Sequence, residues 1–335
     1  MTRTPRSRRL LAALGSALLL GLAACSTPLP EAQPDPVPAV APAATTVSQT
    51  QNILNDIGAV LTAADTALDP ALLPARVVGP ALSIRSAEYT RATATAGAKP
   101  PTALPTDEQA LIVPQIDTWP RTQLVVTQQP DDLQAPRILV LQQAAPREPF
   151  RLWGWARMGA GIQMPPTAAP ETGSPVLAPD ATGLLMTPTE ALQRYADVLA
   201  NGDASPHAAS FLADTFRSSI EAARAATVAG VQAAGSATET YTPEAAPMIT
   251  LGTVDGGAIV VGQLTTVSTV TLTVAGGTIP ISDPFYAALT GKQSATNNFV
   301  RTFTDVLVMY VPPAGSDATV QLLAAEHAVT SATAE

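Results

Sequence analysis

Few side chains in this sequence are suited to covalent chemistry. The chain holds one cysteine, Cys25, and two histidines, His207 and His327. Nucleophilic catalysis needs a serine or cysteine beside a base, and no Gly-x-Ser-x-Gly turn accompanies the histidines. We therefore predict no catalytic residues. Pairs of Asp and Glu can meet from anywhere in a fold, so sequence spacing neither predicts nor excludes acid–base chemistry by carboxylates.

The residues that could hold a metal ion are Asp203 and His207, four positions apart, and the distant pair Glu326 and His327. Histidine and carboxylate are zinc ligands. The plainer interpretation is that Asp203 caps a turn and that His207 lies on the surface in the first turn of a helix. We therefore predict neither a metal site nor a cofactor.

One segment stands out as a candidate ligand-contact surface, made by Arg151, Trp153, Trp155 and Arg157. Alternate side chains of a strand share a face, so these four would lie together. Two indoles between two guanidinium groups could stack on a sugar ring or hold an anionic group. The interpretation that we favour is that both indoles pack against helices while the arginines extend past them or pair with acids.

The first 24 residues have the plan of a signal peptide. Four arginines and no acid come before an apolar run over 10–22, which is too short to span a membrane as a mature helix. Leu22-Ala23-Ala24-Cys25 resembles the lipobox of bacterial lipoproteins. The resemblance implies cleavage before Cys25 and a lipid on its thiol. The alternative is an ordinary secretory signal with a chance cysteine.

We accordingly expect an extracytoplasmic chain, anchored by its N-terminal lipid to the outer face of the cytoplasmic membrane. The charge balance argues against nucleic acid as a further partner. The chain has 18 basic and 27 acidic residues, and loss of the signal peptide removes four of the basic ones. An acidic surface repels phosphate backbones.

The mature chain divides into two similar halves. Residues 25–45 are rich in Pro and Ala and predict a spacer. Apolar residues at helical spacing predict a helix over 47–68 and a second over 72–94, interrupted at Gly79-Pro80. Strands are then predicted at 110–113, 122–128, 137–142 and 150–158.

The second half repeats this order after a linker over 165–186, which is rich in Pro, Thr and Gly. Thr187-Pro188-Thr189-Glu190 is a capping box that begins a helix, and another helix is predicted over about 206–234. Strands follow at 248–254, 258–274, 299–310 and 320–329. Asp255-Gly256-Gly257 forms a tight turn between the first two.

We therefore predict an α+β fold, a tandem of two modules over 46–164 and 187–335, each with helices packed on a bent antiparallel meander sheet. This order resembles the NTF2-like and cystatin-like folds, in which the sheet wraps around the helices and leaves a pocket. The segments 118–121, 129–132 and 151–157 resemble a group of uncharacterised actinobacterial lipoproteins that carry a domain of unknown function. The resemblance implies no activity, since NTF2-like modules serve as enzymes, binding domains and spacers.

These features lead us to expect a non-catalytic binding or scaffold role, with an unknown envelope component or protein as partner. The alternative is an enzyme that acts on a small molecule or an envelope glycan with carboxylates as acid and base. A pocket holding an acid of strongly raised pKa opposite a second polar group would favour the enzyme. A third role, ligand delivery to a permease, is less favoured because alternating βα units are missing.

Overall fold

The computed structural model describes residues 40–129, 135–245 and 247–335. Residues 40–335 form one compact unit. Its mixed helices and large antiparallel sheet confirm the predicted α+β class. The predicted signal peptide, Cys25 and most of the predicted spacer lie outside the described residues. Within the described ranges, no helix has the length and apolar character needed to cross a membrane.

The first half opens with two helices. α1 (Val47–Ala67) begins at a capping box, in which Thr46 and Gln49 each accept the other's backbone N–H. A short 3₁₀ helix, η1 (Pro70–Ala75), leads to α2 (Gly79–Ala94). The predicted interruption at Gly79 is real, because Gly79 adopts a φ of +57° that favours glycine.

The helices of the second half differ in part from those predicted. α3 (Pro188–Asn201) starts at the expected capping box. The long helix predicted over 206–234 is wrong in its first third, where the chain forms the 3₁₀ turns η2 (Gly202–Ala204) and η3 (Ala208–Ser210). α4 (Thr215–Val231) begins only after Asp214, whose carboxylate accepts the N–H of Arg217 and so caps the helix.

The strands form one nine-stranded sheet in the order β1-β3-β4-β5-β13-β12-β9-β7, with β8 also paired to β9. Its strands are β1 (Glu108–Ile112), β3 (Arg121–Thr127), β4 (Arg137–Gln143), β5 (Arg151–Met158), β7 (Gly235–Pro243), β8 (Ile249–Gly252), β9 (Ala258–Leu272), β12 (Asn298–Val311) and β13 (Gln321–Ala334). Two minor pairs are β2 (Pro114–Gln115) with β6 (Ser174–Pro175), and β10 (Ile279–Pro280) with β11 (Ser294–Ala295). A short helix, α5 (Pro284–Thr290), lies between β10 and β11 in the chain.

The two predicted halves share this sheet. β5 pairs with β13 through Met158–Ala324 and Arg157–Ala325, so the strands of both halves make one layer. The predicted linker also joins the fold, since β6 lies within it. β7 was not predicted, because its sequence GSATETYTP carries no apolar run.

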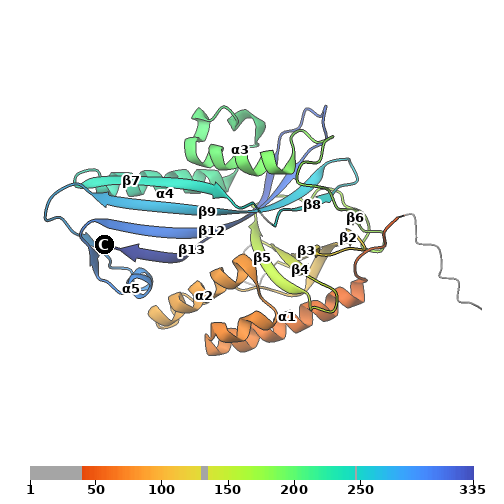
Figure 1. The fold of residues 1–335 in the computed structure, drawn as a ribbon, viewed down its shortest axis with the longest axis horizontal. Helices are drawn as coiled ribbons and strands as arrows, with labels where there is room; N and C mark the ends of the chain where they lie inside the picture. Colours follow the sequence, from red (N-terminus) through yellow and green to blue (C-terminus); the bar gives the residue numbers. More distant parts are fainter. Residues whose placement is uncertain (1–39, 130–134, 246) are drawn as a thin grey trace, which may run out of the picture. The chain divides into compact units, whose positions relative to one another are not determined.

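Side chains on the two faces of the sheet build the two larger of the three core clusters that the described residues form. Along β12, Val306 and Val308 enter the core beneath α1 and α2, whereas Leu307 and Met309 enter the core beneath α3. This alternation is the ordinary period of a strand buried on both faces. Figure 1 shows the two pairs of helices, α1 with α2 and α3 with α4, on opposite sides of the long strands.

Candidate functional site

A pocket of about 680 Å³ lies where the start of β13 meets the end of β5 and the first turns of α4. Apolar side chains supply much of its wall: Met158, Ile162, Leu212, Phe216, Ile220, Leu322 and Leu323. Its charged or titratable side chains are Arg157, Asp214, Glu326 and His327. We term this cavity the β13 pocket. Its volume lies within the roughly 300–1,000 Å³ of small-molecule sites.

The pocket exists because β5 and β13 stay paired for only two residue pairs. Beyond Ala325 the two strands diverge, so β5 no longer covers the edge of β13. On the other side, the backbone N–H of Leu212 donates to Val320 O at 2.8 Å and holds the chain before α4 beside the start of β13. α4 therefore stands over the gap that the diverging strands leave.

His327 has a fixed orientation at the wall of the pocket. Its Nδ1 lies 2.5 Å from Oδ1 of the fully buried Asp305, and Thr266 donates its hydroxyl to Oδ2 at 2.5 Å. Since a carboxylate oxygen accepts, Nδ1 carries the proton and Nε2 is left for another partner. Phe303 stacks on the imidazole at 4.1 Å between centroids, and Phe216 meets it edge-on at 5.9 Å.

Glu326, the next residue on β13, points to the other face of the strand, since its register partner Val306 enters the core beneath α1 and α2. Burial and, to a lesser degree, the negative charge of Glu88 on α2 raise the pKa of Glu326 to about 7, against the opposing effects of Arg137, Arg157 and His327. A carboxyl group that titrates near neutral pH can both take up and release a proton there. Because Glu326 and His327 are consecutive on β13, their side chains point to opposite faces of the strand and do not face each other across the pocket.

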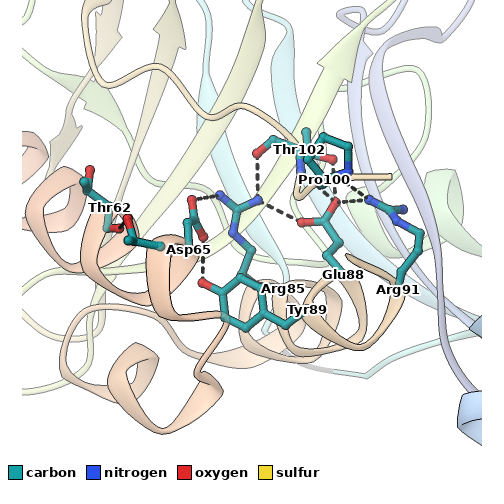
Figure 2. A network of polar contacts seen from close by, with 9 residues as sticks. Thr62, Asp65, Arg85, Glu88, Tyr89, Arg91, Pro100 and Thr102 are labelled. Carbon is teal, nitrogen blue, oxygen red and sulfur yellow. Dashed lines mark hydrogen bonds and ion pairs between the residues drawn. The ribbon is translucent and has the colours of Figure 1, made fainter. Parts of the chain in front are cut away.

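The charge of Glu88 is held in place by a buried network between α1 and α2, shown in Figure 2. Its centre is Arg85, which is 1% exposed and lies 2.7 Å from Asp65 and 2.8 Å from Glu88. Burial alone would lower the pKa of Arg85, but the charges of the two carboxylates outweigh that effect and raise the pKa. Tyr89 donates to Asp65 at 2.6 Å, and burial together with this bond raises the pKa of the phenol.

Glu88 accepts from three further groups in the same network. Arg91 lies 3.3 Å from its carboxylate, the backbone N–H of Thr102 donates to it at 3.2 Å, and the Thr102 hydroxyl also donates to it. Arg85 in turn donates to Thr102 O at 2.6 Å. The network therefore fixes the chain after α2 and acts electrostatically on Glu326. A smaller, polar cavity of about 390 Å³ borders it at Asp65 and Arg85.

The four residues of the predicted contact surface do not lie on one face. Trp155 is fully buried beneath Arg85, at 5.8 Å from guanidinium to ring, and Trp153 is 3% exposed. A bulge at Trp153 interrupts the alternation of β5, since the register against β4 shifts there. Neither indole offers a face to solvent. Arg151 is half-buried, and Arg157 is exposed at the β13 pocket.

The residues that were weighed as possible metal ligands have other roles or positions in the fold. Asp203 is in η2 and pairs with Arg217 at 2.9 Å, and His207 directly precedes η3. Among the residues that the structure describes, no group of three or more His, Cys, Asp or Glu side chains is placed to hold a metal ion.

Sequence reasoning missed the pairing of Asp305 with His327. The available signal was the aspartate itself, which interrupts the apolar run of β12 between Phe303 and Val306. A carboxylate buried in a central strand needs a partner. Only the register of β12 against β13, which places Asp305 opposite His327, identifies that partner.

The model of one protein family matches this chain, namely the domain of unknown function (DUF8094), over residues 40–334. The chain belongs to the DUF8094 family. The DUF8094 match runs through both predicted halves and the segment between them, so the family domain coincides with the compact unit of the structure. No curated protein and no solved structure matches the chain.

Proposed function

We propose that this chain is an exported, lipid-anchored protein that binds a small molecule in the β13 pocket without transforming it. The observation that carries the binding role is the pocket itself. Its volume suits a small molecule, its wall is rich in apolar side chains, and a few polar groups converge on it. His327 is held in one orientation by Asp305, and such preorganisation favours binding.

The membrane anchor is the second part of the proposal. It is supported by the arginine-rich start, the apolar run and Leu22-Ala23-Ala24-Cys25. A diacylglycerol on Cys25 would hold the chain on the outer face of the cytoplasmic membrane, because each buried CH₂ adds about 0.8 kcal/mol. An actinobacterial origin and a likeness of each half to NTF2-like modules belong to the same proposal. The order of helices before antiparallel strands in both halves supports the latter.

Replacing the proposed lipid acceptor should release the chain from membranes. In the bacterium, Cys25→Ser is expected to shift the protein from the detergent-rich to the aqueous phase on detergent phase partition. The intact mass should then lack the diacylglycerol that the wild-type chain carries. Thr27→Ala is the matched control and should partition as the wild type does. Equal partition of Cys25→Ser and wild type would contradict the anchor.

A bulky side chain in the wall of the pocket should abolish binding of an uncharged apolar probe. Ser219 and Ser218 are exposed neighbours on α4 that each donate to the carbonyl four residues earlier, but only Ser219 lines the pocket. The chain from residue 26 onward retains every described residue. It should bind N-phenyl-1-naphthylamine at one site, seen as a saturable rise in emission.

Ser219→Trp should reduce the affinity for this probe at least about ten-fold, whereas Ser218→Trp should leave it unchanged. Both changes have the same cost in helix propensity, so any difference between them reports on the pocket. Absence of saturable binding to the wild-type chain, or equal loss in the two variants, would contradict the proposed binding role.

The same pocket also supports a second function, that of an acid–base enzyme. The observation that favours it is His327, whose imidazole is oriented by a buried carboxylate, as a general base requires. An enzyme consumes its ligand, whereas a binding protein returns it unchanged. Recovery of the bound molecule after incubation with the purified chain therefore separates the two functions.

A further inference from the structure

We propose that the natural ligand of the β13 pocket is an amphipathic organic anion, whose charged group binds Arg157 and whose apolar body lies between α4 and β13. This inference rests on the proposed binding function and gives the chemical class of its ligand. A carboxylate, a sulfonate or a phosphate monoester would share the required chemistry.

Arg157 is the cation that would receive the charged group. Its side chain is exposed at the pocket and forms no hydrogen bond or ion pair with any described residue. Two other titratable groups of the wall, Asp214 and His327, are already engaged. Asp214 caps α4 and accepts the Tyr195 hydroxyl at 2.9 Å. A guanidinium group whose hydrogen-bond donors are not used by described residues is well suited to a planar anion, which it can bind through two parallel hydrogen bonds.

Glu326 would act on the same anion through its charge and not by contact, because its register partner Val306 places it on the face of β13 beneath α2. Four neighbours set its charge: Glu88 from α2 opposes ionisation, while Arg137 from β4, Arg157 from β5 and His327 on its own strand favour it. A bound anion would add a second negative charge beside Glu326 and favour its protonated form. Binding of the anion should therefore take up a proton.

The apolar part of the ligand is indicated by the opposite wall. Phe216 and Ile220 of α4 face the pocket together with Leu322 and Met158. Leu212, at the start of this wall, is 51% exposed. An apolar body placed there would remove Leu212 and the exposed part of Phe216 from water, which is the main source of affinity in such sites. A fully polar anion would leave this surface unused.

A matched pair of probes tests the inference. N-phenyl-1-naphthylamine and 8-anilino-1-naphthalenesulfonate share one apolar body, and only the second carries an anion. At pH 6 the chain from residue 26 onward should bind the sulfonate at least about ten-fold more tightly, in keeping with a charge-assisted hydrogen bond. Arg157→Gln should remove this preference and leave the affinity for the uncharged probe intact. Arg151→Gln changes an arginine of the same strand outside the pocket and should preserve the preference.

The role of Glu326 has its own readout. Sulfonate affinity should fall between pH 6 and pH 8 in the wild-type chain, where Glu326 becomes negatively charged, but not in Glu326→Gln, which carries no charge at any pH. Equal affinity for the two probes, or a preference that survives Arg157→Gln, would overturn the inference. If the wild-type chain still binds the uncharged probe and Ser219→Trp does not, the proposed binding function stands even though the inference about an anion fails. Failure of both probes to bind would overturn both proposals.

Discussion

Replacing Arg85 by methionine should lower the free energy of unfolding by about 3–5 kcal/mol. The guanidinium group is 1% exposed and neutralises Asp65 and Glu88, and Glu88 is itself only 5% exposed. Methionine keeps the apolar stem over Trp155 but leaves Glu88 with only Arg91 and the donors of Thr102. The loss of stability is large because the carboxylate stays buried after its ion partner is removed. The free-energy cost of its desolvation then remains without the attraction that offset it. Urea unfolding followed by far-ultraviolet circular dichroism measures the loss.

A surface ion pair provides the matched control for this change. Arg194 pairs with Glu190 at 2.7 Å one turn away on α3, but the two side chains are 33% and 42% exposed. Arg194→Met should cost less than about 1 kcal/mol, since solvent screens such pairs. Similar losses in the two variants would show that the network of Figure 2 contributes no more than a surface ion pair.

Local sequence signals were sufficient for the elements whose ends are set by nearby side chains. Thr46 and Gln49 begin α1, Thr187 and Glu190 begin α3, and Gly79 separates η1 from α2. Each of these signals acts within four residues, so no tertiary information is needed to interpret it. β12 was predicted almost to its ends because apolar residues fill it on both faces.

The features that were missed depend on contacts between distant parts of the chain. The junction of β5 with β13 joins residues about 170 positions apart in the sequence. From the sequence alone, any exposed strand edge could have been the partner of β5. The bulge at Trp153 breaks an alternation that the sequence alone presents as regular. The β13 pocket combines both effects, since it lies beside the junction. For this reason Arg157 could be named from the sequence, but its neighbours Glu326 and His327 could not be placed beside it.

The stability of the chain should fall as pH rises from about 4.5 to 7, and Glu326 should account for much of that fall. In the folded chain its pKa is about 7, against 4.5 for the unperturbed group. Between these values the folded chain binds a proton that the unfolded chain has lost, so raising the pH favours unfolding. The full shift corresponds to about 3 kcal/mol at 1.36 kcal/mol per pKa unit, and partial exposure of Glu326 reduces it to about 2–3 kcal/mol.

Glu326→Gln should therefore be more stable than the wild type by about 2–3 kcal/mol at pH 8 and nearly equal to it at pH 4, because glutamine resembles the protonated acid in shape and carries no charge. Urea unfolding at the two pH values gives both differences. Glu171→Gln, at an exposed position, should leave the pH profile of the wild type unchanged. Parallel pH profiles for wild type and Glu326→Gln would show that Glu326 is ionised freely in the folded chain. The proton uptake expected on anion binding would then have no source at this residue.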